Sequence, residues 1–338
     1  MNDPVFVEVE CSLAAKQGQP VSGDVFLSRK IKEEGRVVSV LSDGLGSGVK
    51  ANVLATLTST MALDFIVHDT DIEVAARTIM ASLPVCSERG FAYSTFTIVD
   101  IDGDRNVRII EHENPQCIVI RGGTVMAYPT RRIPVAVGTG NIPRERDLAC
   151  SAFQAQPGDR IIVFSDGVSQ AGTGSKQTPM GLGREDVAVT ALGLLRGNPS
   201  ISARDLSRRL VDRARWADGG HPKDDISCAV MYFRRPRRLL VVSGPPYDKR
   251  NDRLIAEKVE HFPGTILVCG GTTAQILGRE LGRHVETNID ELDADIPPSG
   301  RIQGVNLVTE GTLTLERVAD MLASGDTPSD CPPNAASS

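Results

Sequence analysis

The sequence lacks several features that would place the chain in a familiar class. Its seven cysteines include no Cys-x-x-Cys pair, and an odd number without framework spacing predicts reduced thiols rather than a disulfide scaffold. No apolar run reaches the roughly 18 residues that a membrane helix needs. The N-terminal MNDPVFVEVE has neither a basic nor an apolar segment, so no signal peptide is expected. These absences predict a cytoplasmic protein without a membrane partner.

Clustered positive charge is also scarce. The formal net charge is -6, and contacts with nucleic-acid phosphates need grouped Lys and Arg, so no nucleic-acid partner is expected. The one basic run, RRPRR at 234–238, fits a solvated linker. Charged residues make up 24% and apolar residues 41% of the chain, which is enough apolar content for a packed core.

Common catalytic motifs are absent as well. There is no Gly-x-Ser-x-Gly elbow, and the one Cys-x₅-Arg spacing, from Cys228 to Arg234, lies along the expected closing strand rather than in a loop, so a covalent serine or cysteine nucleophile is not indicated. The Walker pattern GxxxxGK[ST] and the dinucleotide pattern GxGxxG are missing too. Nucleotide-binding enzymes of those two types are thereby excluded.

The apolar periodicity predicts a mixture of strands and helices that does not alternate regularly. Strands are expected first, then two helices, then a run of antiparallel strands around an Asp102-Gly103 hairpin turn, then helices at 184–195 and 202–215 and a closing strand, DDISCAVMYF. The other expected strands span 5–13, 36–42, 117–123, 147–155 and 160–165. This order favours an α+β fold, an αββα sandwich of two antiparallel sheets flanked by helices.

The two helices that follow the second strand have clear periods. Val49, Val53, Leu57, Met61 and Phe65 recur every four residues and predict a buried helix face, with Ser47 as a cap. The next helix is predicted from a second set at i, i+3, i+4 and i+7 spacing, with Asp71 as its cap and Pro84 at its end. That set comprises Ile72, Ala75, Ala76, Ile79, Met80 and Leu83.

A domain boundary is predicted at the RRPRR run. Residues 1–236 form the first domain in this interpretation. Residues 237–323 alternate strand and helix strictly, which indicates a small parallel α/β accessory domain for regulation or docking. The tail 324–338 has almost no apolar content and is expected to be disordered.

Aspartates stand at the ends of several predicted strands. Asp43 and Asp166 each follow an apolar strand and a serine and precede a glycine, while Asp224 and Asp225 directly precede the closing strand. Asp24 lies in VSGD. Carboxylates gathered at one sheet edge repel one another unless cations compensate, and oxygen ligands select Mg²⁺ or Mn²⁺ over zinc. One Asp-Gly alone is only a turn, but this set predicts a metal site.

These segments carry a family resemblance. VSGD, SDGLGSGVKA, VFSDGV and DDISCAV, in that order, resemble the PP2C-type (PPM) metal-dependent protein phosphatases and, more closely, their bacterial SpoIIE-like branch. The match covers roughly residues 5–235, with Leu45 where the branch usually has methionine. The resemblance implies a serine/threonine phosphatase with two Mn²⁺ or Mg²⁺ ions per site, which hydrolyses phosphoserine or phosphothreonine on a bacterial regulatory protein by attack of metal-bound water.

The resemblance also assigns roles to residues. Asp43 would bridge both metals, Gly44 would offer its carbonyl to one, and Asp24, Asp166 and Asp224 would complete the ligands, with Asp24 and Asp43 the catalytic pair. Asp225 would lie beside them in a supporting position. Lys16, the basic residue nearest VSGD, is a candidate for binding the substrate phosphate.

Two other functions remain open from the sequence. One is a dinuclear-metal phosphohydrolase of a small phosphoester, and the other is a phosphatase-like scaffold that binds a partner without turnover. Loss of metal aspartates is the usual mark of such a scaffold, and all four are present here. The sequence names no particular substrate, no ligand of the accessory domain and no oligomeric state.

Overall fold

The structure, a computed structural model, describes residues 5–68, 70–82, 94–137, 144–287 and 299–324. It divides into two compact units, Met1–Arg235 and Pro236–Ser338, with the division inside the RRPRR run. The expected end of the second helix, Leu83 and Pro84, and all but the first residue of the expected disordered tail lie outside the described residues.

Two antiparallel sheets make up the middle of the first unit. One has five strands in the order β1-β11-β10-β6-β7, and the other has six in the order β2-β3-β4-β5-β9-β8. The five-stranded sheet contains β1 (Phe6–Ala14), β6 (Ile118–Arg121), β7 (Thr124–Val125), β10 (Arg160–Phe164) and β11 (Ile226–Arg234). The six-stranded sheet contains β2 (Asp24–Ile31), β3 (Arg36–Gly44), β4 (Ser94–Ile101), β5 (Asn106–His112), β8 (Thr130–Val137) and β9 (Arg144–Gln154).

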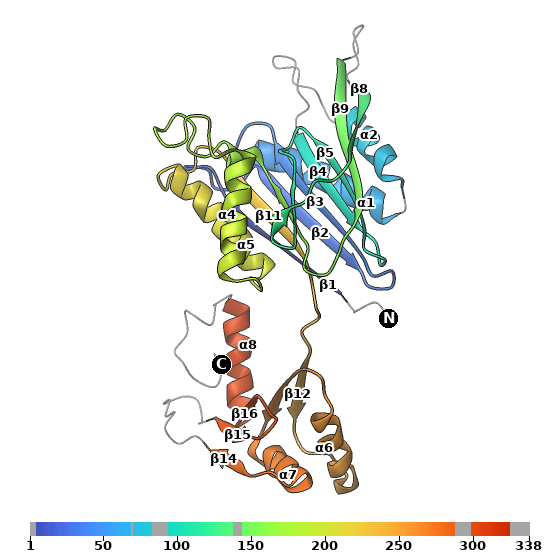
Figure 1. Cartoon of the computed structure of the whole chain (residues 1–338), viewed down its shortest axis with the longest axis vertical. Coiled ribbons are helices and arrows are strands. Elements are labelled where there is room, and N and C mark those ends of the chain that lie inside the picture. The colour runs from blue at the N-terminus through green and yellow to red at the C-terminus, as the bar shows by residue number, and fades with distance from the viewer. Residues whose placement is uncertain (1–4, 69, 83–93, 138–143, 288–298, 325–338) are drawn as a thin grey trace. The chain divides into compact units, whose positions relative to one another are not determined.

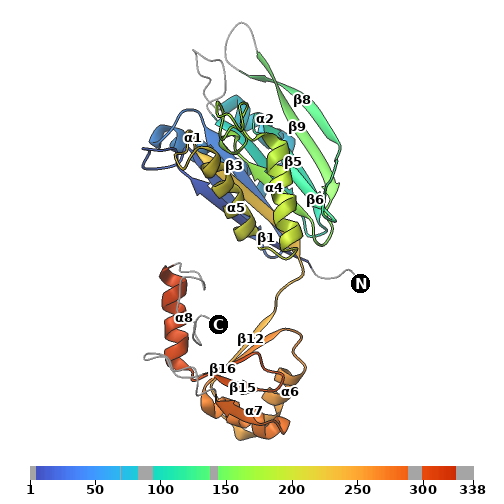
Figure 2. The ribbon, with the colours of Figure 1, turned by 60° about the vertical axis from the view of Figure 1, so that its left-hand side comes forward.

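Three apolar clusters divide the first unit into layers. One fills the space between the sheets, with Val37 and Leu41 of β3 against Met231 and Phe233 of β11. The second lies between the six-stranded sheet and the helices α1 (Val49–Val67) and α2 (Ile72–Ser82). The third lies between the five-stranded sheet and α3 (Asp166–Ser169), α4 (Gly183–Gly197) and α5 (Ala203–Ala217). Helices therefore cover both outer faces (Figures 1 and 2), and the predicted α+β sandwich is confirmed.

The face of α1 that was predicted to be buried is buried only in part, because Met61 and Phe65 pack against the second apolar cluster but the first three residues of the repeat do not. Val49, Val53 and Leu57 are 62%, 59% and 48% exposed. The buried residues are instead small ones on another face of the helix, together with one isoleucine: Ala51, Ala55, Thr58, Ser59, Ala62 and Ile66. The helix lies so close to β3 that small side chains are needed at the contact, and the larger aliphatic groups face outward. Ser47 is not the cap either, because the helix begins after Gly48 without a side-chain cap.

Other local predictions hold. Asp71 caps α2, since its carboxylate accepts hydrogen bonds from the backbone N–H groups of Glu73 and Val74 at 3.0 and 3.2 Å. The buried set of α2 is the predicted one as far as the structure describes it. Ser202 caps α5 by accepting from the N–H of Asp205 at 3.0 Å. These helices carry one apolar stripe each, so their periodicity identifies the buried face.

The second unit has a mixed sheet in the order β12-β13-β16-β15-β14. The strands are β12 (Leu239–Ser243), β13 (Thr265–Cys269), β14 (Val285–Thr287), β15 (Gly300–Ile302) and β16 (Leu307–Thr309). The helices are the 3₁₀ turn η1 (Lys249–Asn251), α6 (Asp252–Glu260), α7 (Gly271–Leu281) and α8 (Thr312–Ser324). β12, β13 and β16 are parallel as predicted, but β14 and β15 add antiparallel pairs. The prediction of a purely parallel unit is therefore wrong.

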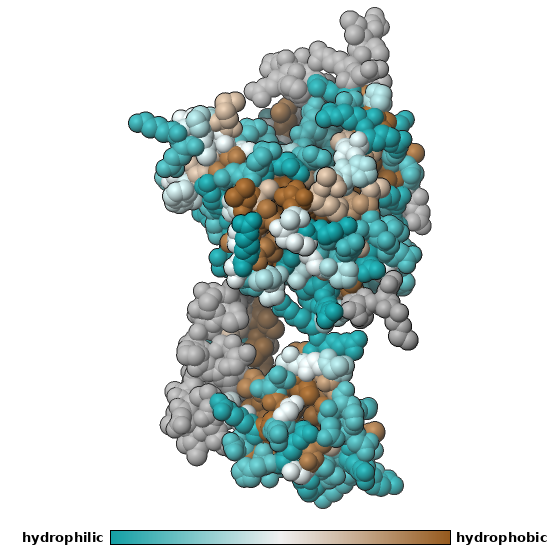
Figure 3. Space-filling view, in the orientation of Figure 1, coloured by the Kyte–Doolittle hydropathy of each residue, from teal (hydrophilic) through white to brown (hydrophobic). Residues whose placement is uncertain are grey.

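The surface of the first unit is mostly polar on the side seen in Figure 3, with a group of hydrophobic residues beside α4. Within the described ranges, none of the helices has the length and apolar character that crossing a bilayer would require.

Candidate functional site

Three strand ends of the five-stranded sheet meet at one edge. β1 and β10 both pair antiparallel with β11, so the start of β11 lies beside the ends of the other two strands. Asp224 comes just before β11, Asp166 comes just after β10, and Lys16 follows β1 by two residues. The topology thus brings two acidic residues and one basic residue from distant parts of the sequence to the same place.

The six-stranded sheet supplies the facing pair of carboxylates. Asp24 opens β2 and is the register partner of Asp43 near the end of β3. Directly opposed residues of an antiparallel pair have their side chains on the same face and about 5 Å apart at Cβ. The Ser94 hydroxyl at the start of β4 donates to the Asp43 carbonyl at 3.0 Å and fixes the end of that strand.

Two glycines let the backbone approach closely at the aspartates. A Cβ at Gly44 would lie 2.0 Å from the carbonyl oxygen of Ala51 in α1. A Cβ at Gly167 would lie 2.0 Å from the carbonyl oxygen of Asp225. No side chain fits at such distances, so close packing requires glycine after both Asp43 and Asp166.

A cavity of about 420 Å³, called here the acidic cavity, collects these groups. It is lined by Lys16, Asp43, Gly44, Leu45, Gly46, Ser47, Ser94, Thr95, Glu113, Asp166 and Asp224. Five of the residues singled out from the sequence, Lys16, Asp43, Gly44, Asp166 and Asp224, therefore lie around one space. Asp24 and Asp225 are buried beside it and do not line it.

Asp24 is the most unusual of the carboxylates. It is 2% exposed, and neither of its oxygens has a hydrogen-bond partner. Burial is the main cause that raises its pKa, and the charges of Asp225 and Asp166 add to it. The nearby hydroxyls of Ser165 and Ser227 oppose that rise, although neither meets the geometry of a hydrogen bond to Asp24. A buried carboxylate in this state is costly unless a proton or a cation compensates it.

The pKa values of Asp43 and Asp224 are shifted in the same direction as that of Asp24. Burial raises the pKa of Asp43, followed by the charges of Asp24, Asp166 and Asp224. The pKa of Asp224 is also raised, first by burial. Among the described residues, no three acidic, histidine or cysteine side chains lie close enough together to hold a metal ion. Carboxylates repel one another when no cation lies between them, which explains this spacing. The donor set consists of oxygen atoms only, which fits Mg²⁺ or Mn²⁺.

Lys16 and Asp225 are connected through the backbone. The N–H of Lys16 donates to the Asp225 carboxylate at 2.9 Å. Lys16 and Asp224 line the same cavity, and the charge of Lys16 opposes the rise in the pKa of Asp224 that burial causes. Asp225 thus holds the segment that carries Lys16 at the rim of the acidic cavity.

Several residues around the aspartates were not singled out from the sequence. The Gln170 amide donates to Asp166 at 2.8 Å, from four residues further along the chain. Glu113 and Thr95 line the acidic cavity. The i, i+4 spacing of Asp166 and Gln170 is a sequence signal that could have been used. Glu113 follows β5, outside every acidic motif, and only the folded arrangement brings it to the cavity.

Comparisons with known proteins relate most of the first unit to one family. A sequence model of the family described as Stage II sporulation protein E (SpoIIE) matches residues 33–234. Stage II sporulation protein E of Bacillus subtilis (strain 168) is 24% identical over 219 residues, which are 64% of this chain and 24% of that protein. The chain thus spans about a quarter of the length of this curated relative.

Solved structures show the same fold for the first unit. The PP2C phosphatase domain of SpoIIE from Bacillus subtilis, solved with a fragment of its regulatory domain, aligns with a TM-score of 0.55 at 20% identity. That alignment covers 70% of this chain and 66% of the other. The RsbU and RsbW domains of a Mycobacterium tuberculosis protein align with a TM-score of 0.52 at 16% identity, covering 76% and 68%.

Proposed function

The chain belongs to the stage II sporulation protein E (SpoIIE) family, and on that basis we propose that it is a metal-dependent protein serine/threonine phosphatase. Its first unit has the PP2C-type phosphatase fold. The observation that carries the proposal is the buried, unpartnered carboxylate of Asp24 opposite Asp43, at the edge of a cavity that Asp166 and Asp224 also enter. Such a group of acids needs cations to be stable at neutral pH.

The residues present fit two divalent cations of the Mg²⁺ or Mn²⁺ kind. Asp43 would be shared by both ions, Asp24, Asp166 and Asp224 would supply further oxygens, and the Gly44 carbonyl is also available at the cavity. When bound, such ions make a water molecule nucleophilic and stabilise charge on phosphoryl oxygens.

The chain's own residues prepare the site for a phosphate monoester. Lys16 at the rim offers an ammonium group for the substrate phosphate, and Asp225 keeps the Lys16 backbone in place. Gln170 holds one oxygen of Asp166, which orients the carboxylate toward the cavity. Gly44 and Gly167 keep the surrounding backbone close-packed, so the aspartates stand on a rigid frame.

The proposed substrate is a phosphorylated bacterial regulatory protein in the cytoplasm. Support comes from the family and from the RsbU and RsbW domains named for one structural relative. The second unit, which has an apolar core of its own, is proposed as an accessory module for docking or regulation.

The test compares Asp43→Asn with Asp64→Asn, an exposed acid on α1. With Mn²⁺ present, Asp43→Asn should lower hydrolysis of phosphoserine peptides by about 100-fold or more, because the variant loses a charge shared by both cations. Asp64→Asn should keep wild-type rates. Near-normal activity of a folded Asp43→Asn protein would show that the active site lies elsewhere. A preference for sugar phosphates or nucleotides over phosphopeptides would show that the substrate is a small phosphoester and not a protein.

A further inference from the structure

A second cavity, called here the side cleft, adjoins the acidic cavity. Its volume is about 610 Å³, within the range of sites that enclose small ligands. The lining residues are Glu111, Glu113, Asn114, Gln116, Thr130, Arg132, Arg146, Asp147 and Ala149. Glu113 belongs to the walls of both spaces, so it lies where the side cleft meets the acidic cavity.

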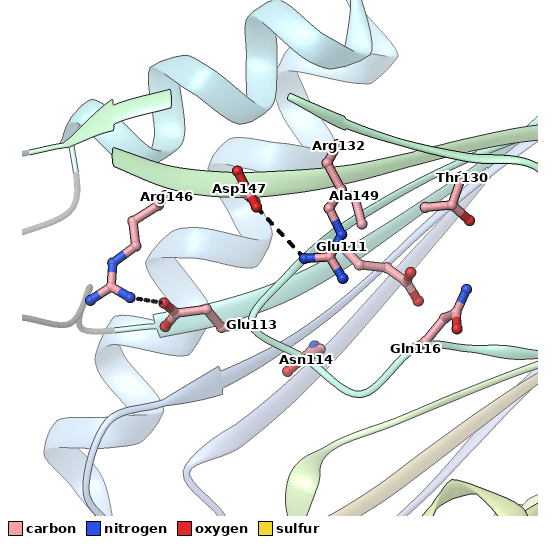
Figure 4. Close-up of a pocket in the computed structure, with 9 residues that line it drawn as sticks. All are labelled: Glu111, Glu113, Asn114, Gln116, Thr130, Arg132, Arg146, Asp147 and Ala149. Atoms are coloured by element: carbon pink, nitrogen blue, oxygen red, sulfur yellow. Dashed lines mark ion pairs between the residues drawn. The ribbon is translucent and has the colours of Figure 1, made fainter. Parts of the chain in front are cut away.

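The side cleft has two walls, one with acidic and amide side chains and the other with two arginines and an aspartate (Figure 4). One wall follows the end of β5, and the other is formed by the paired strands β8 and β9. Arg146 pairs with Glu113 at 3.2 Å, and Arg132 lies 3.6 Å from Asp147. The buried carboxyl group of Glu111 accepts from the backbone N–H of Cys117 at 2.6 Å. Because positive and negative groups nearly balance, the side cleft suits a polar polypeptide segment rather than a strongly acidic or basic one.

Glu113 is held rigidly in an uncommon backbone conformation. Its φ is 57°, a left-handed value that residues other than glycine rarely adopt. The next residue, Asn114, donates to the Thr97 hydroxyl at 3.1 Å and accepts from the Thr95 hydroxyl, which fixes the turn to β4. Arg146 on β9 then sets the position of the Glu113 carboxylate. Backbone strain of this kind persists where the surrounding structure overdetermines it, often at functional sites.

We propose that the side cleft receives the polar segment that flanks the phosphorylated residue of the substrate protein, and that Glu113, oriented by Arg146, is a specificity-determining residue. This inference rests on the proposed function. A phosphoserine whose phosphate enters the acidic cavity carries its neighbouring residues past Glu113. The side cleft is then the space that distinguishes a polypeptide from a small phosphate ester.

The experiment compares two substrates in the full chain with Mn²⁺. One is an aryl phosphate, and the other is a heptapeptide with a central phosphoserine flanked by uncharged polar residues. The variants are Glu113→Gln, Glu113→Gly and Arg146→Gln. The matched control is Asp186→Asn, which removes the acidic partner of an ion pair with Arg213 between α4 and α5. The exposure of this pair is similar to that of the pair in the side cleft: the side chains of Arg213 and Asp186 are 31% and 37% exposed, and those of Arg146 and Glu113 are 29% and 27% exposed. The readout is kcat/KM for the peptide divided by kcat/KM for the aryl phosphate.

All three side-cleft variants should lower this ratio by about tenfold, mainly through a higher KM for the peptide, and the control should keep it within about twofold. Glu113→Gly is decisive, because glycine relieves the left-handed backbone but removes the carboxylate. A ratio in that variant equal to wild type would show that Glu113 serves only the turn, and the inference would be wrong. An equal fall in Asp186→Asn, or no change in any variant, would also overturn it. Wild-type protein inactive on both substrates would refute the proposed function and this inference together.

Discussion

Asp24 and Asp43, opposed on β2 and β3, give the protein a specific dependence on pH in the absence of metal. Burial and neighbouring charges raise the pKa of both groups in the folded state. Between the ordinary aspartate pKa near 4 and those raised values, the folded state binds more protons than the unfolded state. These two groups therefore destabilise the folded state, and the destabilisation increases as the pH rises through that window.

The resulting prediction compares wild type with Asp43→Asn in a chelating buffer. The variant should be more stable than wild type at pH 8, with a smaller difference at pH 5, because protonation relieves the repulsion in wild type at low pH. Thermal unfolding at the two pH values measures both differences. Added Mn²⁺ should reverse the order at pH 8. A variant that is less stable than wild type at pH 8 without metal would mean that these carboxylates are already compensated.

A second residue-scale prediction concerns Arg105 in the hairpin between β4 and β5. The Asp102-Gly103 turn is present, but the left-handed residue is Arg105, with φ 68°, and not Gly103. Arg105→Gly should raise the free energy of unfolding by about 1 kcal/mol, because glycine adopts this conformation without steric cost. Arg105→Ala should give no such gain, since alanine keeps the penalty. Urea denaturation of both variants measures the effect, and an equal gain in both would contradict the explanation.

The aspartates could be proposed as candidates from the sequence because each stands at a strand end in a recognisable motif. Their environment was not, since the burial of Asp24 and the placement of Asp225 beside the acidic cavity depend on how two sheets pack. Glu113 shows the limit most clearly. It follows an ordinary strand, and neither its left-handed backbone nor its position between two cavities has a signal in a single sequence.

At the scale of elements, α1 shows why periodicity can choose the wrong face. Its sequence is apolar on more than one side, so a four-residue repeat of Val and Leu predicted a buried stripe. The close approach of the helix to β3, seen where Gly44 meets Ala51, admits only small side chains. Strands were missed for different reasons. β8 contains Arg131, Arg132 and Pro134 and lies at a sheet edge, while β14 and β15 have three residues each.

The packing of α1 predicts opposite effects at neighbouring positions. Val53→Lys should change the free energy of unfolding by less than about 0.5 kcal/mol, because the side chain is 59% exposed and lysine favours helices. Ala55→Leu should cost about 1–3 kcal/mol or more, because Ala55 is fully buried against the sheet. Chemical denaturation of the two variants measures both values. If Val53→Lys lowered the free energy of unfolding more than Ala55→Leu, the buried face would be the one predicted from the sequence.

For the whole molecule, the sandwich was predictable from the order of strands and helices, whereas the sheet order was not. The pairing of β1 with β11 joins the two ends of the first unit and follows from no local pattern. The same pairing brings Lys16 next to Asp224 and Asp225. Candidate site residues could thus be proposed one by one from the sequence, but their three-dimensional arrangement depends on contacts that are distant in sequence.

A whole-molecule prediction concerns the division at Arg235. All three apolar clusters of the sandwich lie before it, and the second unit has its own. A chain truncated after Arg235 should therefore fold and hydrolyse an aryl phosphate at about the full-length rate per folded, metal-loaded molecule. Circular dichroism and size exclusion establish folding before the rates are compared. A folded but inactive truncated chain would show that the second unit helps to build the active site.

A single titration tests whether the acidic cavity works with divalent cations. Hydrolysis of an aryl phosphate by the full chain is followed as Mn²⁺ is raised to about millimolar concentration, then after excess chelator, then after Mn²⁺ is restored. Activity should appear with Mn²⁺, disappear with chelator and return when the ion is added back. The reason is that the carboxylates of the acidic cavity cannot activate water without a cation. Undiminished turnover in excess chelator would contradict it.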